Sequence, residues 1–358
     1  MVLLQIGFAG MYVLTMFSFK RGMSIYVFTV YRHVVATLVI APFALLLERD
    51  TRPKLTFRVF LRIAMLAFLE PVLDTDLYNV GMKYTTATFA SATLNTIPAI
   101  TFILALVFRL ESVNIKKVHS VAKVIGTLIT FLGAMVMTFY KGHVLAFVSS
   151  HNNNNNNHGE GEQHWVIGTV LLFASCIAWA AFFILQALTL KEYPAELSLT
   201  ALMCLMGSVE GAIATLVMEN NMSVWKIGFD SGLLSVAYSG VVCSGIAYYV
   251  QGVVSRERGP FFVSAFSPLC MIFTAFLGSI FLAETLHLGS ILGAILIVFG
   301  LYTLVWGKSK EPLLTTTAIA EDTFLEETKI NVKDGKTSGD HNGRRELPPT
   351  TGTYMLNC

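Results

Sequence analysis

A few ionisable side chains lie inside long apolar stretches of this chain, where a charge is costly. They are Arg32, Glu70, Asp74, Asp76 and Glu210. A charge at the centre of a membrane-spanning helix costs about 2.5–3.5 kcal/mol on insertion scales, so such residues pair with one another or serve a substrate or ion pathway. Arg32 and Asp74 fall at similar depths on adjacent predicted spans, and we expect them to form an ion pair. That pair either contacts a substrate or only makes insertion tolerable.

Glu70 and Glu210 are predicted nearer mid-membrane, with no cation beside them in the sequence. A functional role, or a protonated neutral form, is therefore the better interpretation for both. His33 is interpreted as a packing residue rather than a proton carrier. Prolines interrupt three spans, and helices bent by proline often line cavities, so nearby amides and hydroxyls are also candidates. The candidate substrate-binding residues are Arg32, Glu70, Asp74, Asn95, Glu210, Gln251 and Ser264.

Patterns typical of enzymes are missing. Only His33 among the eight histidines lies well inside an apolar stretch, so neither an intramembrane Ser–His pair nor a histidine metal site is predicted. The five cysteines have no metal-binding spacing, and no GxxxxGK[ST] phosphate loop occurs. The net charge of +2 gives no reason to expect a nucleic-acid partner. We expect no catalytic residue, no metal, no cofactor and no direct use of ATP.

Composition and the length of the apolar runs predict an all-α membrane protein. The chain is 54% hydrophobic and 13% charged, whereas soluble domains carry roughly 25% charged residues. Runs of about 20 apolar residues, enough to cross a hydrocarbon core ~30 Å thick, recur as far as Trp306. We predict ten transmembrane helices near 1–19, 26–47, 59–79, 86–108, 121–140, 165–188, 198–218, 232–251, 260–282 and 287–306.

Basic residues in the predicted hinges indicate the orientation. With a cytoplasmic N-terminus, most of them fall on the cytoplasmic side: Arg49, Arg52, Lys54, Arg58, Arg109, Lys116, Lys117, Lys191, Arg256, Arg258, Lys308 and Lys310. The other side holds only Lys20, Arg21, Lys83, Lys141 and Lys226. Cytoplasmic loops of membrane proteins carry this excess of Lys and Arg. We therefore expect both termini in the cytoplasm.

The two halves of the chain also match each other in order. Nearly constant offsets join Phe89 to Phe262, Glu111 to Glu284, Gly126 to Gly293 and Gly133 to Gly300. Each half contains five predicted helices. Because five is odd, the second half crosses the membrane in the opposite sense to the first. Inverted repeats of this kind place a substrate site between the halves. The recurring glycines suit close helix packing within or between subunits, which leaves a homodimer open. The predicted parts are five-helix repeats at 1–140 and 165–307, an Asn-rich non-cytoplasmic loop at 141–164 and a disordered cytoplasmic tail at 308–358.

Several short motifs resemble one plant family over residues 1–310. They are Tyr31-Arg32-His33, Ala41-Pro42-Phe43-Ala44, Leu69-Glu70-Pro71, Gly81-Met82-Lys83-Tyr84-Thr85, Pro98-Ala99-Ile100-Thr101-Phe102, the run from Ser244 to Gly252, and Trp306-Gly307-Lys308. The chain is similar to the nodulin-21-type, walls-are-thin-related transporters, also called usually-multiple-acids-move-in-and-out transporters. They belong to the drug/metabolite transporter superfamily and carry EamA domains.

The resemblance implies ten helices in two inverted repeats and facilitated, bidirectional movement of amino acids, with auxin as the alternative substrate. It also implies the plasma membrane, or else the vacuolar membrane. The expected partners are the lipid bilayer and a small-molecule substrate. A receptor or scaffold that transports nothing is the rival class. Two departures are noted: the chain starts almost inside the first span, and Asp74-Thr75-Asp76 replaces the usual Asp-Gln-Asn.

Overall fold

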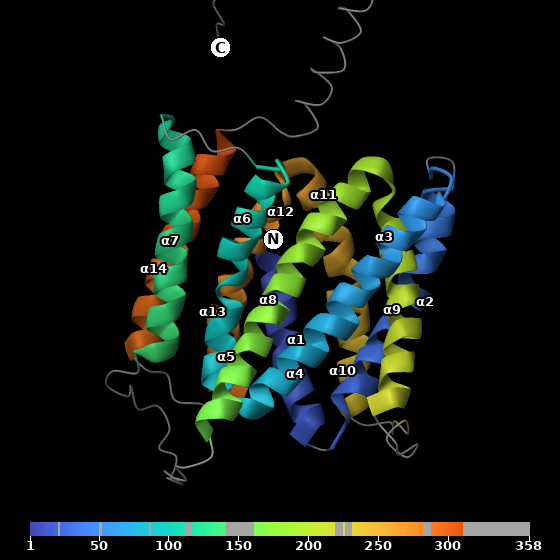
Figure 1. The fold of residues 1–358 in the computed structure, drawn as a ribbon, viewed down its shortest axis with the longest axis horizontal. Helices are drawn as coiled ribbons and strands as arrows, with labels where there is room; N and C mark the ends of the chain where they lie inside the picture. The colour runs from blue at the N-terminus through green and yellow to red at the C-terminus, as the bar shows by residue number, and fades with distance from the viewer. Residues whose placement is uncertain are drawn as a thin grey trace, which may run out of the picture. The chain divides into compact units, whose positions relative to one another are not determined.

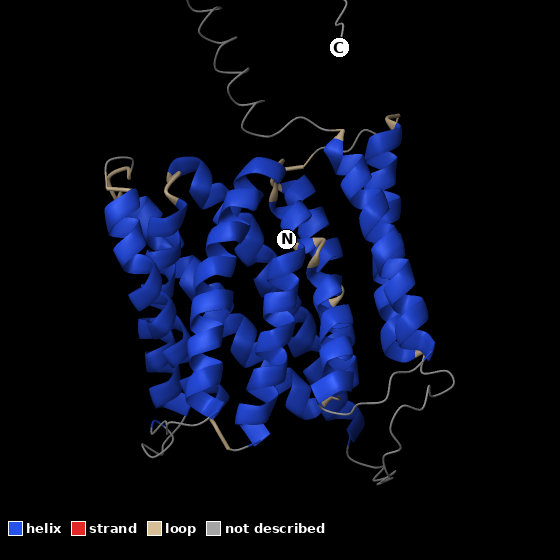
Figure 2. Ribbon diagram, turned by 180° about the vertical axis from the view of Figure 1, so that it is seen from behind, coloured by secondary structure: helices blue, strands red, loops and turns tan. Residues whose placement is uncertain are grey.

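Long apolar segments satisfy their backbone hydrogen bonds in lipid only as helices or closed barrels. In the computed structural model the regular secondary structure of the described residues is helical, and none of these residues forms a strand (Figure 2). The description covers residues 1–20, 22–49, 52–85, 87–111, 116–140, 161–218, 225, 231–281 and 288–310. The predicted Asn-rich loop, apart from its last residues, and the tail beyond residue 310 lie outside these ranges. All of the described residues belong to one compact unit, Met1–Leu314.

The first half of the chain begins with two uninterrupted helices and ends with a third, and the helices between them are divided. These elements are α1 Val2–Lys20, α2 Ile25–Leu47, α3 Phe57–Ala67 continued by η1 Phe68–Asp74 and α4 Thr75–Tyr84, α5 Ala87–Leu94, α6 Ile97–Val107, and α7 Val118–Phe139. Here η1 is a π-helical segment, with a wider turn than an α-helix.

The second half repeats this pattern, including a π-helical segment in the middle of its third stretch. Its elements are α8 Gly161–Glu192, α9 Glu196–Met218, α10 Ser231–Tyr238 continued by η3 Ser239–Ile246 and α11 Ala247–Arg258, α12 Pro260–Ser264, α13 Ser267–Phe281, and α14 Leu288–Ser309. Helix α8 begins within the predicted 141–164 loop, so the last residues of that loop are helical instead.

Seven helical stretches within the described residues are long and apolar enough to cross a membrane, and the protein is an integral multi-pass membrane protein. They are Ile25–Leu47, Val118–Phe139, Trp165–Glu192, Glu196–Met218, Gly232–Arg258, Pro260–Ile280 and Leu288–Ser309. Two shorter apolar helices are Val2–Met16 and Ile97–Val107. Each predicted span overlaps a helical stretch, and the count of ten stays a prediction.

Proline residues explain where the divided helices are interrupted. It donates no backbone hydrogen bond and its ring clashes with the carbonyl one turn back. Pro71 lies within η1, and Pro98 and Pro268 lie in the first turns of α6 and α13. At the α5–α6 break the Thr93 carbonyl accepts hydrogen bonds from the Thr96 nitrogen at 2.9 Å and from Cys176 Sγ of α8 at 3.3 Å. The Thr93 carbonyl group at the break therefore has hydrogen-bond donors from neighbouring groups.

Helices α7 and α14 pack along each other at one edge of the bundle, as both views show (Figures 1 and 2). A Cβ on Gly126 would lie 2.7 Å from the Gly300 carbonyl oxygen, and one on Gly293 would lie 2.6 Å from the Gly133 carbonyl oxygen. Only glycine allows this approach of the two backbones. The predicted close packing at these glycines occurs within one chain, and the homodimer stays a prediction.

Two buried carboxylates, Glu48 and Glu111, form polar contacts at predicted cytoplasmic hinges. The Glu48 carboxylate, at the end of α2, accepts hydrogen bonds from the backbone nitrogens of Leu197 and Ser198 at 2.9 and 2.7 Å, which caps the start of α9. The buried Glu111 carboxylate binds Lys123 Nζ of α7 at 2.6 Å and Lys308 Nζ of α14 at 2.7 Å. The contacts of Glu48 with α9 and of Glu111 with Lys308 each join the first half of the chain to the second.

Candidate functional site

A cavity of about 420 Å³ lies in the middle of the bundle, within the range of small-molecule sites. Both halves of the chain contribute to its wall. The aromatic lining residues are Phe8, Tyr12, Tyr78, Trp179 and Phe183. The uncharged polar ones are Gln5, Asn95, Gln251, Ser267, Thr274 and Ser290. None of the described residues that line the cavity carries a formal charge.

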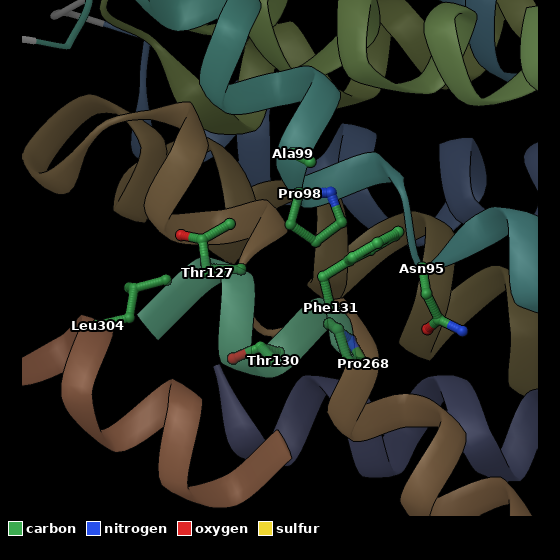
Figure 3. A pocket seen from close by; sticks show the side chains of 9 residues that line it. Asn95, Pro98, Ala99, Thr127, Thr130, Phe131, Pro268 and Leu304 are labelled. Atoms are coloured by element: carbon green, nitrogen blue, oxygen red, sulfur yellow. The ribbon is translucent and has the colours of Figure 1, made fainter. Parts of the chain in front are cut away.

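The two broken helices supply much of this wall. Asn95 occupies the α5–α6 break and Ser267 opens α13, so each break places a polar side chain at the cavity. Asn95 Nδ2 also lies 3.4 Å from Met271 Sδ of α13, which brings the two broken helices together. Behind Asn95, Pro98 and Pro268 approach Phe131 around a void of about 10 Å³, no larger than one water molecule (Figure 3). Of these two spaces, only the central cavity is large enough for a small-molecule ligand.

A buried ion cluster lies beside the cavity, and its pairing differs from the one predicted. Arg32 Nη2 binds Glu70 Oε1 at 2.9 Å, and His33 Nε2 lies 3.3 Å from Glu70 Oε2. The predicted Arg32–Asp74 pair was wrong, because Arg32 takes Glu70 as its partner. The interpretation of Glu70 as an acid without a cation was wrong for the same reason. The cluster joins α2 to η1 at a depth where isolated charges are costly.

Asp74 instead faces α8. Its Oδ1 accepts a hydrogen bond from the Ser175 hydroxyl at 2.5 Å, and the Asp74 side chain is buried. Both acids lie within the π-helical segment η1, Glu70 near its start and Asp74 at its end, and they contact different helices. Asp74 nevertheless stands close to Tyr12 and Tyr78 of the cavity wall, with which it interacts electrostatically.

The remaining candidates divide between the cavity and its surroundings. Asn95 and Gln251 line the cavity. Ser264 is buried and its hydroxyl donates to the Phe261 carbonyl at 3.0 Å, which leaves it outside the lining. Glu210 lies on α9, outside the lining, and its Oε2 is buried without a hydrogen-bond partner among the described residues. Also within that part of the chain, no three His, Cys, Asp or Glu side chains gather closely enough to hold a metal ion.

The aromatic part of the site was not predicted from the sequence. Trp179 and Phe183 of α8 line the cavity, but α8 is apolar on all sides, so lipid-facing, core and cavity residues look alike in its sequence. Gln5 was missed although a signal existed, because it is an amide within the apolar run of α1. An uncharged polar residue inside a predicted span was the feature that could have identified this cavity-lining position.

Comparison with known proteins assigns a family. The profile of the EamA-like transporter family matches residues 1–139 and again residues 166–306. Three WAT1-related proteins of Arabidopsis thaliana are 58%, 55% and 58% identical over 88%, 94% and 86% of this chain, and the alignments cover 84%, 91% and 84% of those relatives.

A solved crystal structure of a protein superposes on this chain with a TM-score of 0.64. The superposition covers 84% of this chain and 97% of that chain at 15% sequence identity. At such low identity the likeness concerns the fold alone.

Proposed function

The chain belongs to the EamA-like transporter family as a WAT1-related member, and we propose that it moves amino acids across a membrane in both directions by alternating access, without direct use of ATP. The coarser statement, a membrane transporter of small metabolites, follows from the family. The more specific proposal, amino acid transport, is supported by the central cavity. Both halves of the chain line it, and none of its described lining residues carries a formal charge. A site shared by two halves can be opened to either side when one half moves against the other.

An inverted repeat with ten spans is part of this proposal, and the α7–α14 contact supports it. Under the predicted repeat Gly126 corresponds to Gly293, and Gly133 to Gly300. The observed contacts are Gly126 with Gly300 and Gly133 with Gly293. Exchanging the two halves therefore turns one contact into the other, as a twofold axis between antiparallel helices requires. The π-helical segments η1 and η3 also occur in corresponding stretches. The same correspondence underlies the proposed 1–140 and 165–307 repeats.

We take neutral amino acids as the substrate class. A zwitterion needs a partner for its carboxylate and for its ammonium in a dry cavity. The amide groups of Asn95 and Gln251 can donate to the carboxylate, and the aromatic faces of Tyr78 and Trp179 can attract the ammonium. Arg32 and Glu70 neutralise each other, so they serve the substrate indirectly, through the neighbouring wall.

The experiment is an efflux panel in oocytes preloaded with labelled glutamine. Gln251→Leu and Asn95→Leu keep the size of the side chain and remove its hydrogen-bonding groups, and each is expected to lower efflux at least tenfold, the effect of losing about 1.4 kcal/mol. The matched control is Thr303→Val, a polar-to-apolar change on α14 outside the cavity. Equal efflux from all four proteins, with normal surface expression, would remove the cavity from the pathway.

Auxin is the second candidate, and the aromatic wall is the observation that favours it. Phe8, Tyr12 and Phe183 offer flat apolar surface to an indole ring. An arm of the same panel preloaded with indole-3-acetic acid separates the two substrates. Auxin efflux without glutamine efflux would reverse our order.

The plasma membrane is the proposed location, with the vacuolar membrane as the alternative. A fluorescent fusion observed in plant protoplasts decides between them. The rival class, a receptor or scaffold, predicts no exchange of labelled solute across a sealed bilayer. Counterflow by purified protein in liposomes without ATP would exclude both that class and an ATP-driven pump.

A further inference from the structure

His33 has one ring nitrogen whose protonation is fixed by its neighbour. Its Nδ1 lies 2.8 Å from the Thr29 carbonyl oxygen, one turn earlier on α2. A carbonyl oxygen can only accept a hydrogen bond, so Nδ1 must carry a proton and donate it. In the neutral imidazole the other nitrogen, Nε2, then holds a bare lone pair.

That lone pair faces a carboxylate oxygen. His33 Nε2 lies 3.3 Å from Glu70 Oε2, and the His33 side chain is 1% exposed. Within the described part of the chain neither atom has a hydrogen-bond partner of ordinary geometry, although the Tyr248 hydroxyl also approaches the Glu70 carboxylate. Two acceptors at this distance repel each other in a medium of low dielectric constant. One proton between Nε2 and Oε2 converts the repulsion into a charge-assisted hydrogen bond.

We infer that the contact between His33 and Glu70 is a proton-binding site and that its occupancy is coupled to transport. Binding one proton changes the cluster of Arg32, His33 and Glu70 from net charge 0 to +1, and releasing it restores 0. No bond other than that to the proton is made or broken. The inference rests on the proposed function, because it deepens the account of the same transporter.

Other titratable or charged groups face this contact from each neighbouring element. They are Arg32 of α2, Asp74 of η1, Cys204 of α9 and Tyr248 of α11. From η3, Cys243 faces Arg32. From α8, Cys176 faces Asp74. Arg32 holds the other Glu70 oxygen, so the carboxylate keeps a cationic partner whether or not the proton is bound. The site can therefore lose its proton without leaving a buried anion unpaired.

Three elements connect this contact to the cavity. On α1, Met11 lies beside Arg32 and Tyr12 lines the cavity. On α11, Tyr248 approaches the Glu70 carboxylate, and Gln251 lines the cavity one turn later. The stretch from η1 into α4 carries Glu70 at one level and cavity-lining Tyr78 two turns on. A change of charge at Glu70 therefore acts on helices that also form the substrate wall.

The first test measures the proton directly and needs no substrate. Full-length protein labelled with ¹⁵N-histidine is studied in bilayers by solid-state NMR, and the His33 signals are those lost in His33→Gln. The glutamine amide can still donate to Glu70, so the Arg32–Glu70 pair is retained. We expect the His33 Nε2 shift to change between acidic and alkaline buffer. In Glu70→Gln, whose amide donates to Nε2, this change should disappear, whereas in His119→Gln, outside the cluster, it should persist. A shift that is constant over the range would overturn the inference.

The second test measures coupling. Proteoliposomes with the membrane potential clamped by valinomycin are given a gradient of one pH unit, and labelled glutamine is the probe. One coupled proton drives the glutamine ratio up to about tenfold away from equality, and His33→Gln should return it to equality while counterflow continues. Equality in the wild type, with counterflow intact, would overturn proton coupling alone. If the wild type showed no counterflow at any pH, the proposed function would fail instead, and the NMR result would still decide the proton site.

Discussion

Replacing Gly300 by alanine tests the close approach of α7 and α14. A Cβ there would lie 2.6 Å from the Thr130 backbone nitrogen and 2.8 Å from the Gly126 carbonyl oxygen. An ordinary contact begins at 3.4 Å, so the shortfalls are 0.8 and 0.6 Å. Both neighbours are backbone atoms of α7, and neither can rotate away. The helices must separate, and overpacking of this kind costs about 1–3 kcal/mol.

The matched control is Gly211→Ala, within α9. A Cβ on Gly211 would meet only Val30 Cγ2, at an ordinary 3.5 Å. Both substitutions carry the same gain in helix propensity, about 1 kcal/mol, so their difference isolates the steric cost. We expect thermal unfolding midpoints in lipid nanodiscs to differ by roughly 2–9 °C, with Gly300→Ala the lower. Equal midpoints would refute the view that the two backbones require glycine.

Substitutions at Glu48, Glu111 and Asp74 probe buried polar contacts by the same unfolding assay. Glu48→Ala removes both acceptors that cap α9 and should cost about 0.5–2 kcal/mol, whereas Glu48→Gln, which keeps one oxygen, should cost less. Glu111→Gln should cost about 3–5 kcal/mol, and adding Lys123→Met should recover part of it; no recovery would argue against a shared charge network. Asp74→Asn keeps an acceptor for Ser175 and should unfold near the wild type, and Asp74→Leu should cost about 1–3 kcal/mol; equal losses would contradict the hydrogen bond.

The sequence predicted the helices and several of their contacts because these depend on local rules. Apolar runs of sufficient length gave helical stretches that overlap the structure throughout, and Pro98 and Pro268 indicated the two broken helices. Glycines spaced seven residues apart predicted close helix packing without naming the partner helices, which the structure shows to be α7 and α14. The family resemblance, carried by short motifs, was confirmed by the family match over both halves.

The pairing of the buried charges was beyond the sequence for a geometric reason. The depth of Asp74 was counted along a regular α-helix, but Glu70 and Asp74 both lie within the π-helical segment η1, whose turn is wider. Pro71 predicts a disturbance of the helix there without giving its kind. The directions of the two acids therefore did not follow from depth, and the contacts of Glu70 with Arg32 and His33 were not predicted.

The α7–α14 contact has a consequence for how the protein is made. Helix α14 starts roughly 150 residues after α7 ends, and at 5–20 residues per second the ribosome needs on the order of ten to thirty seconds to reach it. During that interval the glycine face of α7 has only lipid or other helices beside it, and Glu111 has Lys123 but not Lys308. A nascent chain that stopped before α14 would keep this open edge, which membrane chaperones and proteases could recognise as unfinished. Within the described residues, the last helix along the chain is the one that closes it.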